Sequence, residues 1–351
     1  MDTAAIAQVL REARVLDAGG SLDVAPVSNH PARAAGHART SYRVSTGGRP
    51  ICHLTVGGDL HDLWERTRDF ATACPTIACR PLFRHRNGGN EFVGVEYFEG
   101  DNLESLAAKG AITSAEAVAC GERIVAALEE TRQPSTAEAA RREMDSTLDW
   151  IFASPLFGSL DRVVLNELIL PFIRAGALEG PHATRWTNRD LIPRNVLRND
   201  GEETRLIDCE FAARTHFFAE DWWRWHTHSG LGSDARDLPS LRKELPAAPW
   251  LEALFLLRQM ALTCEISGAA QALADSHFVI DRLAALAAEA RGERQPNVFF
   301  KPYASRNAEE LAHLKTVYVA LVQRQEETQR ALLQAEAALD KVRNAGKAKS
   351  P

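Results

Sequence analysis

The chain has 351 residues, of which 45% are apolar and 25% charged, and its formal net charge at pH 7 is −6. This length suffices for two lobes with substantial cores, and the composition is that of an ordinary globular protein. The small negative charge provides no global attraction to nucleic acid or to anionic membranes, so we expect no nucleic-acid partner.

Features of membrane insertion and export are also missing from the sequence. No run approaches the roughly 20 apolar residues that span a bilayer. The first residues lack the basic segment and apolar core of a secretory signal. The cysteines have neither metal-ligand spacing nor a disulfide pattern, and we interpret the nearest pair, Cys74 and Cys79, as ordinary thiols. Together these features indicate the reducing cytoplasm.

A short helix and three strands are predicted first. Residues 4–17 carry apolar side chains at helical spacing and are followed by Gly19 and Gly20. Residues 21–57 then favour strands, the last two joined by a turn at 46–50. These strands are expected at 23–27, 41–45 and 51–56.

A second helix follows the third strand. Asp59 is its predicted N-cap, with Asp62 as a weak capping-box partner. Pro75 and Pro81 break the chain after this helix, and residues 92–98 are predicted to form another strand.

Helical periodicity dominates the rest of the chain. The helical segments are expected within 103–178, at 251–257 and at 280–290. Because strands come first and helices afterwards, we predict an α+β fold with a small β-rich lobe and a larger α-rich lobe. The expected boundaries are 1–100 for the first lobe and 101–295 for the second.

The last segment has a heptad pattern. Beyond a polar linker at 291–304, apolar residues alternate at spacings of three and four between Leu311 and Val342. Gln325 and Thr328 are polar positions in the middle of this seam, which weakens it but can fix its register. We predict a coiled coil over 305–345; a single amphipathic helix packed on the second lobe is the alternative.

Residues 186–211 contain the most informative polar pattern. Asp190 is followed five residues later by Asn195, then by a short predicted hairpin and an apolar run that ends in Asp208. Phosphoryl transfer needs one carboxylate to orient the attacking hydroxyl, and an amide and a second carboxylate to hold Mg²⁺ against the nucleotide phosphates. Asp190 fits the first role, and Asn195 and Asp208 fit the second. The alternative is a simple polar turn, but the hairpin and the strand-embedded Asp208 favour a kinase-like site.

These motifs resemble the aminoglycoside phosphotransferase and choline kinase branch of the protein-kinase-like superfamily, over roughly residues 20–290. The family's His-Gly-Asp-(four residues)-Asn loop corresponds to residues 188–195, and its Ile-Asp-Phe-Glu metal motif to residues 207–210. The family's lobe connection, Glu-Tyr-φ-x-Gly, corresponds to residues 96–100.

The resemblance implies a two-lobed protein-kinase-like fold and several nucleotide contacts. It implies that the carbonyl of Glu96 and the N–H of Phe98 meet the adenine edge. It also implies that Glu65 is the helix glutamate that positions a phosphate-binding lysine.

A finer resemblance is to kinases that modify bacterial surface polysaccharides, such as O-antigen kinases. Those kinases favour Thr-Asn before the catalytic Asp, as at Thr187 and Asn188, and Pro-Arg-Asn at the end of the loop, as at 193–195. They also favour a His-Phe-Phe-x-Glu-Asp-Trp segment, which corresponds to residues 216–222.

The sequence departs from the family at the phosphate-binding lysine. Alignment places Thr55 at this position on the third strand, and Thr cannot supply a cation. His53, on the same face of the strand, and Arg43, on the preceding strand, are the predicted replacements. Arg39, in the loop before that strand, is a further candidate.

Residues near the metal motif have further expected roles, and for two of these features an alternative stays open. Glu210 is expected either to aid a second Mg²⁺ or to hydrogen-bond the catalytic loop, and Asp221 to anchor the backbone of that loop. Trp222 and Trp225 share a helix face and are expected in the core, with sugar stacking as the alternative.

The sequence therefore predicts a Mg²⁺-dependent kinase that moves the γ-phosphate of ATP or GTP to a saccharide hydroxyl in surface-polysaccharide assembly. A homo-oligomer or a protein partner is expected through 305–345, in the cytoplasm or at the inner membrane beside a glycan-assembly complex. One alternative is a pseudokinase scaffold, suggested by the missing lysine. Another is a small-molecule kinase of the choline or aminoglycoside type.

Overall fold

The computed structural model describes most of the chain up to residue 268. The described residues are 3–16, 21–29, 39–157, 169–177, 182–228, 231, 238–242, 249–268, 272, 282–283, 286, 328–332 and 334–335. The predicted helix at 280–290 and the predicted coiled coil at 305–345 lie mostly outside these residues, and the linker at 291–304 lies wholly outside them.

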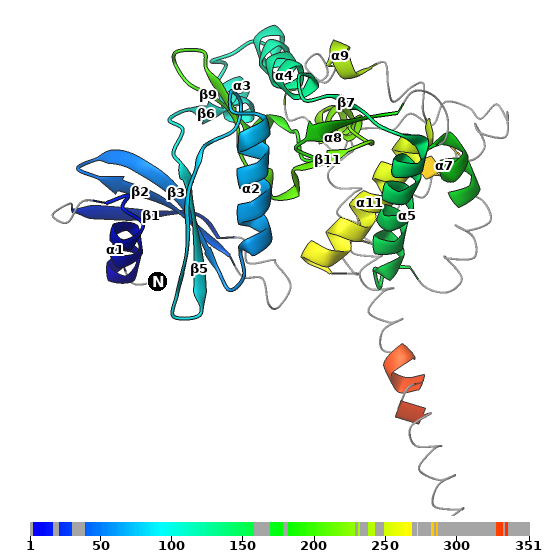
Figure 1. Cartoon of the computed structure of the whole chain (residues 1–351), viewed down its shortest axis with the longest axis horizontal. Helices are drawn as coiled ribbons and strands as arrows, with labels where there is room; N and C mark the ends of the chain where they lie inside the picture. The colour runs from blue at the N-terminus through cyan, green and yellow to red at the C-terminus, as the bar shows by residue number, and fades with distance from the viewer. Residues whose placement is uncertain are drawn as a thin grey trace, which may run out of the picture.

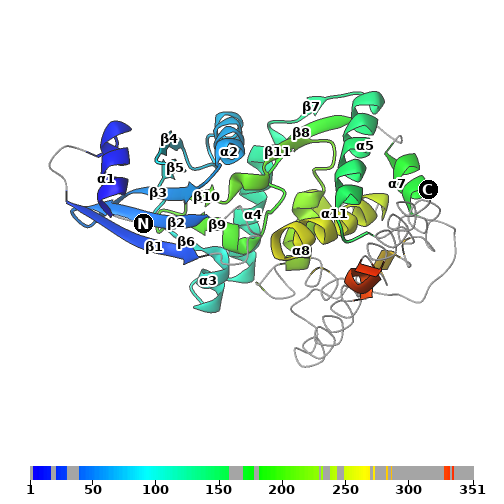
Figure 2. The ribbon, with the colours of Figure 1, turned by 90° about the horizontal axis from the view of Figure 1, so that it is seen from below.

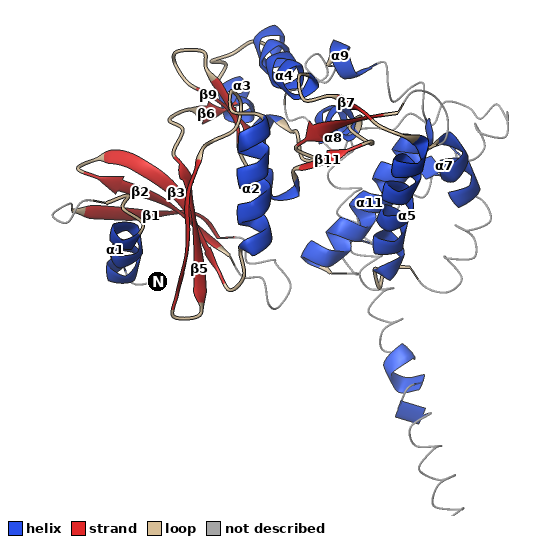
Figure 3. Ribbon diagram, viewed as in Figure 1, coloured by secondary structure: helices blue, strands red, loops and turns tan. Residues whose placement is uncertain are grey.

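An antiparallel sheet of five strands forms the N-terminal end of the molecule (Figure 1 and Figure 3). Its strand order is β1-β2-β3-β5-β4. The strands are β1 (Leu22–Asn29), β2 (Thr40–Thr46), β3 (Arg49–Gly57), β4 (Pro81–Asn87) and β5 (Asn90–Glu96). The three strands predicted before residue 57 and the turn between the last two are confirmed. The strand predicted at 92–98 is β5, which begins and ends two residues earlier.

Strand β4 is a correction, because Pro81 was expected to break the chain there. Pro81 is the first residue of β4, and β4 is an edge strand, where a proline's missing N–H removes no bond of the interior ladder. Gly88 and Gly89, both with positive φ, turn the chain into β5. This turn was the available signal for the hairpin.

One face of the sheet is covered by helix α1 (Thr3–Glu12), which crosses the strands (Figure 2). The helix buries Ile6, Val9 and Leu10 against alternate residues of β3, namely Cys52, Leu54 and Val56. Because side chains alternate along a strand, His53 and Thr55 belong to the opposite face. The residues predicted to face the phosphates are therefore kept out of this small core.

Helix α2 (His61–Ala73) begins later than predicted. Its N-cap is Leu60, not Asp59. The Leu60 N–H donates to Glu91 Oε2 at 2.7 Å, so a buried carboxylate of β5 fixes the entry of the chain. Asp59 instead accepts a hydrogen bond from the N–H of His61 at 3.1 Å.

Helices dominate the second half of the described chain, as predicted. They are α3 (Leu103–Ala108), α4 (Ser114–Glu129), α5 (Ala137–Ala153), α7 (Leu170–Gly176), α8 (Glu220–His228), α9 (Pro239–Arg242) and α11 (Pro249–Ser267). Two small antiparallel sheets lie among them, in the orders β10-β9-β6 and β11-β8-β7. Their strands are β6 (Asp101–Asn102), β7 (Gln133–Pro134), β8 (Ala183–Thr187), β9 (Val196–Arg198), β10 (Thr204–Leu206) and β11 (Ala213–Thr215).

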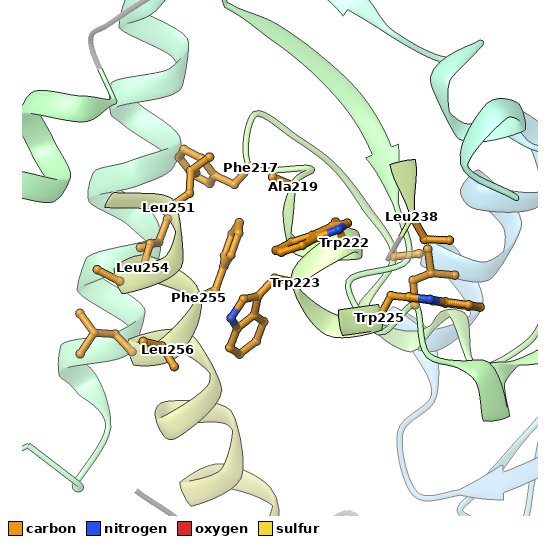
Figure 4. Close-up of a cluster of buried hydrophobic side chains, with 14 of the residues drawn as sticks. Phe217, Ala219, Trp222, Trp223, Trp225, Leu238, Leu251, Leu254, Phe255 and Leu256 are labelled. Carbon is orange, nitrogen blue, oxygen red and sulfur yellow. The ribbon is translucent and has the colours of Figure 1, made fainter. Parts of the chain in front are cut away.

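The larger hydrophobic core joins these helices and also takes in the end of α2, through Phe70. Figure 4 shows its aromatic centre, where Trp223 lies beside Phe255 with ring centroids 5.9 Å apart. Trp222 and Trp225 are both buried, which confirms their placement in the core. Side chains so covered offer no open face for a sugar to stack on.

All six cysteines are free and buried. Burial raises the pKa of Cys52, Cys74 and Cys79 to about 12 in each case. None of the described helices is long and apolar enough to cross a membrane.

Candidate active site

The catalytic-loop motif leaves β8 in a tight turn. Arg189 has a φ of 59°, in the left-handed region. The Asn188 side chain accepts a hydrogen bond from the Asp190 N–H at 3.2 Å, which is the local turn that Asn favours. The turn directs Asp190 into the interior, and the short helix η1 (Pro193–Asn195) then returns the chain to β9.

Asp221, on α8, anchors the backbone of this loop, and its predicted structural role is confirmed. Its carboxylate accepts hydrogen bonds from the Arg189 N–H at 3.3 Å, from the Thr187 hydroxyl, and from Arg185 Nη2 at 2.8 Å. Both the Asp221 and the Arg185 side chains are fully buried. Burial raises the pKa of Asp221 to about 6, and the charge of Arg185 opposes that rise.

The Asp190 carboxylate is held at both oxygens. Oδ2 accepts a hydrogen bond from Asn195 Nδ2 at 2.9 Å, and Oδ1 accepts one from Arg224 on α8. Arg224 also donates to Gln259 Oε1 at 2.5 Å. Burial acts to raise the pKa of Asp190, but Arg224, Arg194 and Asn195 together hold it below its ordinary value. Asp190 is thus ionised at neutral pH and can accept a hydrogen bond from a hydroxyl.

Asn195 links the catalytic loop to the metal motif. Its Nδ2 group is committed to Asp190, through the side chain and through the backbone carbonyl at 3.0 Å. This arrangement turns its amide oxygen away from Asp190. Its own carbonyl accepts from the Ile207 N–H at 2.9 Å, which brings Asp208 to the same end of the hairpin.

Asp208 has a left-handed backbone, with φ 57° and ψ 60°. Its carbonyl accepts a hydrogen bond from Asn188 Nδ2 at 3.2 Å. The turn after β8 is therefore bonded to the turn after β10. Within the described residues, no group of three His, Cys, Asp or Glu side chains forms a ready-made metal site. An amide oxygen and one carboxylate are instead the kind of incomplete oxygen set that Mg²⁺ completes with water and phosphate.

The residues predicted to bind the adenine and phosphates are brought together only in part. Arg43 and His53 face each other across β2 and β3, and the Arg43 guanidinium lies 5.2 Å from the centroid of the Tyr97 ring. Burial lowers the pKa of His53, so its imidazole is neutral at pH 7 and supplies no cation there. Glu65 bonds instead to Arg68 on its own helix, at 2.9 Å.

The segment after β5 leaves one backbone donor open. Glu96 ends that strand, and its N–H donates to the carbonyl of Arg80 at 2.8 Å. Across the part of the chain that the structure describes, the Phe98 N–H has no hydrogen-bond acceptor. Arg205 lies 5.6 Å from the centroid of the Phe98 ring. A donor left open beside a strand end can bind the edge of a base.

Glu210 makes the contact that the sequence did not predict. Its carboxylate accepts from Arg39 Nη1 at 2.7 Å, across 171 positions of the chain. Its backbone carbonyl accepts from Arg66 on α2 at 2.8 Å. Neither Arg39 nor Arg66 belongs to a local sequence motif, so only the folded chain reveals that they pair with Glu210.

No protein-family model matches the sequence, and no curated protein sequence matches it. Among solved structures, the aminoglycoside phosphotransferase APH(4)-Ia is similar with a TM-score of 0.54 and 14% identity, over 83% of this chain and 97% of that one. Choline kinase LicA from Streptococcus pneumoniae has a TM-score of 0.48 and 10% identity, over 82% of this chain and 98% of that one. A choline/ethanolamine kinase family protein from Mesorhizobium loti has a TM-score of 0.47 and 14% identity, over 89% and 98%. The first likeness confirms the expected kinase-like α+β fold.

Proposed function

We propose that the chain is a phosphotransferase that moves the γ-phosphoryl group of ATP or GTP to a hydroxyl. The observation that carries this proposal is the connected unit of Asp190, Asn195 and Asp208. Asn195 bonds to the carboxylate of Asp190 and, through its backbone, to the residue before Asp208. Phosphoryl transfer depends mainly on positioning and charge stabilisation, and this unit fixes its groups in that way.

Each residue then has a distinct task. Asp190 orients the acceptor hydroxyl and accepts its proton late in the transfer. Asn195 and Asp208 would hold Mg²⁺, which supplies charge neutralisation at the nucleotide phosphates. The carbonyl of Glu96 and the N–H of Phe98 bind the base.

For the acceptor, we propose a saccharide hydroxyl of a bacterial surface polysaccharide. Support comes from sequence likeness alone, through Thr187, Asn188, the Pro-Arg-Asn end of the loop and the segment 216–222. The second candidate is a small-molecule kinase, favoured by the structural similarity to the aminoglycoside phosphotransferase APH(4)-Ia.

The proposed arrangement places the nucleotide between a β-rich lobe, residues 1–100, and an α-rich lobe, residues 101–295. Segment 305–345 is proposed to make the protein oligomeric or to bind a partner protein. A pseudokinase scaffold would use the same segment without catalysis. Its discriminating feature is the absence of Mg²⁺-dependent nucleotide binding.

A thermal-shift experiment tests the nucleotide site. The protein is melted with ATP or GTP, each with Mg²⁺ or EDTA, beside the Asp208→Asn variant. Ligand at about 100 times its Kd should add roughly 2.7 kcal/mol to the free energy of unfolding, which is several degrees in Tm. We expect this shift to require Mg²⁺ and to be lost in Asp208→Asn. No shift with either nucleotide at millimolar concentration would favour the scaffold.

A further inference from the structure

The third strand supplies no cation at the position of the family's phosphate-binding lysine. Thr55 lies on β3 between Ser41 of β2 and Val93 of β5. It occupies the position that aligns with the family's phosphate-binding lysine. A nucleoside triphosphate nevertheless carries several negative charges that need neutralising. If the proposed function is right, the cation must come from another element.

Arg39 is placed to provide it. It directly precedes β2, whose first residue, Thr40, pairs with Val56, and Ser41 pairs with Thr55. Residue 39 therefore lies at the same end of the sheet as Thr55. Because it is two residues before Ser41, it is also on the same face of the sheet as Ser41 and Thr55. Its guanidinium reaches Glu210, two residues after Asp208, at 2.7 Å. The cation thus lies beside the loop that carries the proposed metal ligand.

The side chains of Arg39 and Glu210 are largely buried but still partly exposed to solvent. The Arg39 side chain is 22% exposed and that of Glu210 is 10% exposed. Glu210 is itself held in place, because its carbonyl accepts from Arg66 on α2. A carboxylate on an anchored backbone therefore holds a guanidinium that still meets solvent, and such a group can reach a ligand.

The other candidates fit less well. Arg43 is exposed and lies over the ring of Tyr97, four residues further along β2 than Arg39. His53 is neutral at pH 7. Glu65, expected to position the cation, is paired with Arg68 on its own helix.

We propose that Arg39 is the phosphate-binding cation of this site and that Glu210 positions it. The pair does the work that a strand lysine and a helix glutamate do together in other kinases. An arginine suits the task because it has five donors, so one nitrogen can hold Glu210 while others bind phosphate oxygens. The inference rests on the proposed function, since it assumes that a nucleotide binds.

Calorimetric titration separates the phosphate contact from the base contact. Mg·ATP and adenosine are each titrated into the full-length protein, or Mg·GTP and guanosine if the guanine nucleotide is the one that binds. The variants are Arg39→Ala, Arg39→Lys and the matched control Arg49→Ala. Arg49 is an exposed arginine at the other end of the β2–β3 hairpin, so its loss changes the net charge equally.

We expect Arg39→Ala to weaken Mg·ATP by roughly tenfold to a hundredfold, the range for a hydrogen bond to a charged group. Adenosine affinity should stay unchanged, which also shows that the variant is folded. Arg39→Lys should fall between, because an ammonium keeps the charge but cannot hold both partners equally well. The control should bind both ligands like the unmodified protein.

Three other outcomes would overturn the proposal in different ways. Equal affinity of Arg39→Ala and Arg49→Ala for Mg·ATP would remove Arg39 from the phosphate site. An equal loss of both ligands in Arg39→Ala would show that its role is structural. An unmodified protein that binds neither ligand would overturn the proposed function itself.

The positioning role of Glu210 has its own test in a double-mutant cycle with Glu210→Gln. If Glu210 acts through Arg39, Glu210→Gln weakens Mg·ATP less than Arg39→Ala does, and the double variant equals Arg39→Ala alone. Additive losses would show that Glu210 contacts the ligand or metal independently. No loss in Glu210→Gln would show that Arg39 needs no positioning carboxylate.

Discussion

The charge state of Asp190 depends on one neighbour that comes from a different element. Arg224 on α8 bonds to Oδ1, while burial acts in the opposite direction on the pKa. A depressed pKa keeps the carboxylate ionised at neutral pH. It also makes the group a weak base, which suits proton transfer that occurs late in the reaction.

Replacing Arg224 should therefore raise the pKa of Asp190. In Arg224→Gln the burial that opposes ionisation remains and its main compensation is gone, so the titration moves to higher pH. Carbon-13 NMR of the Asp190 carboxyl, assigned through Asp190→Asn, measures the shift directly. Arg142→Gln, which alters an exposed arginine paired with Glu138, is the matched control. An unmoved titration would mean that Arg224 is not the dominant charge on Asp190.

The same pair also has a linkage consequence of definite sign. A carboxylate whose pKa is lower in the folded protein stabilises the fold above its unfolded pKa. That contribution is lost as pH falls through the folded pKa. Arg224→Gln should remove it, so the free energy of unfolding of the variant should fall less steeply as the pH is lowered.

Asp190→Asn gives the corresponding kinetic test. If Asp190 orients the hydroxyl and takes its proton, the amide should lower the transfer rate by about 10²–10⁴. Nucleotide affinity should hold, because Asp190 is not proposed to touch the phosphates. Single-turnover transfer and titration of Mg·ATP separate the two quantities, and an unchanged rate would contradict the assignment.

At the scale of elements, a close approach explains one glycine. A Cβ on Gly94 of β5 would lie 2.2 Å from the Phe83 ring of β4, whereas a Cβ on Gly58 would meet nothing within 4 Å. Phe83 packs over the backbone of the neighbouring strand, so glycine there is a packing requirement. This contact lies two residues before the proposed base-binding segment.

Gly94→Ala should thus destabilise the fold by roughly 1–3 kcal/mol through overpacking. Gly58→Ala, in open space with an ordinary backbone, should change stability by less than about 0.5 kcal/mol. Urea unfolding of both variants gives the comparison. Equal midpoints would show that the β4–β5 hairpin relaxes to accept a methyl group.

The elements also show what the sequence could reveal. Asp190, Asn195 and Asp208 were found because their spacing is local and chemically constrained. Strand β4 was missed because Pro81 suggests a break unless one knows that the strand is at an edge. The cap of α2 was misplaced since Leu60 is fixed by Glu91, a residue of a later strand.

Long-range pairing sets the remaining limit. Arg39 with Glu210 and Arg224 with Asp190 join residues 171 and 34 positions apart, and no periodicity connects them. Charged side chains are abundant, so a pairing of this kind is invisible until the backbone brings the partners together. The sequence could name Arg39 as a candidate but could not choose it over Arg43.

At the scale of the whole molecule, the proposed association through 305–345 can be tested by truncation. Gel filtration of the full chain and of a chain lacking 305–351 should show loss of an oligomer if the heptads form a coiled coil. A compact monomer in both cases would favour the small-molecule kinase. Nucleotide binding by the shortened chain would show that the kinase fold stands without the segment.

The burial of every cysteine makes the chain its own reporter of local opening. Thiol reagents attack the thiolate, and burial raises the pKa of the Cys209 thiol, between Asp208 and Glu210, well above its ordinary value. Alkylation under native conditions must therefore wait for the surrounding segment to open. The labelling rate of each cysteine would record the opening frequency of its own neighbourhood. The rate at Cys209 would record the loop beside the proposed phosphate cation without any added probe.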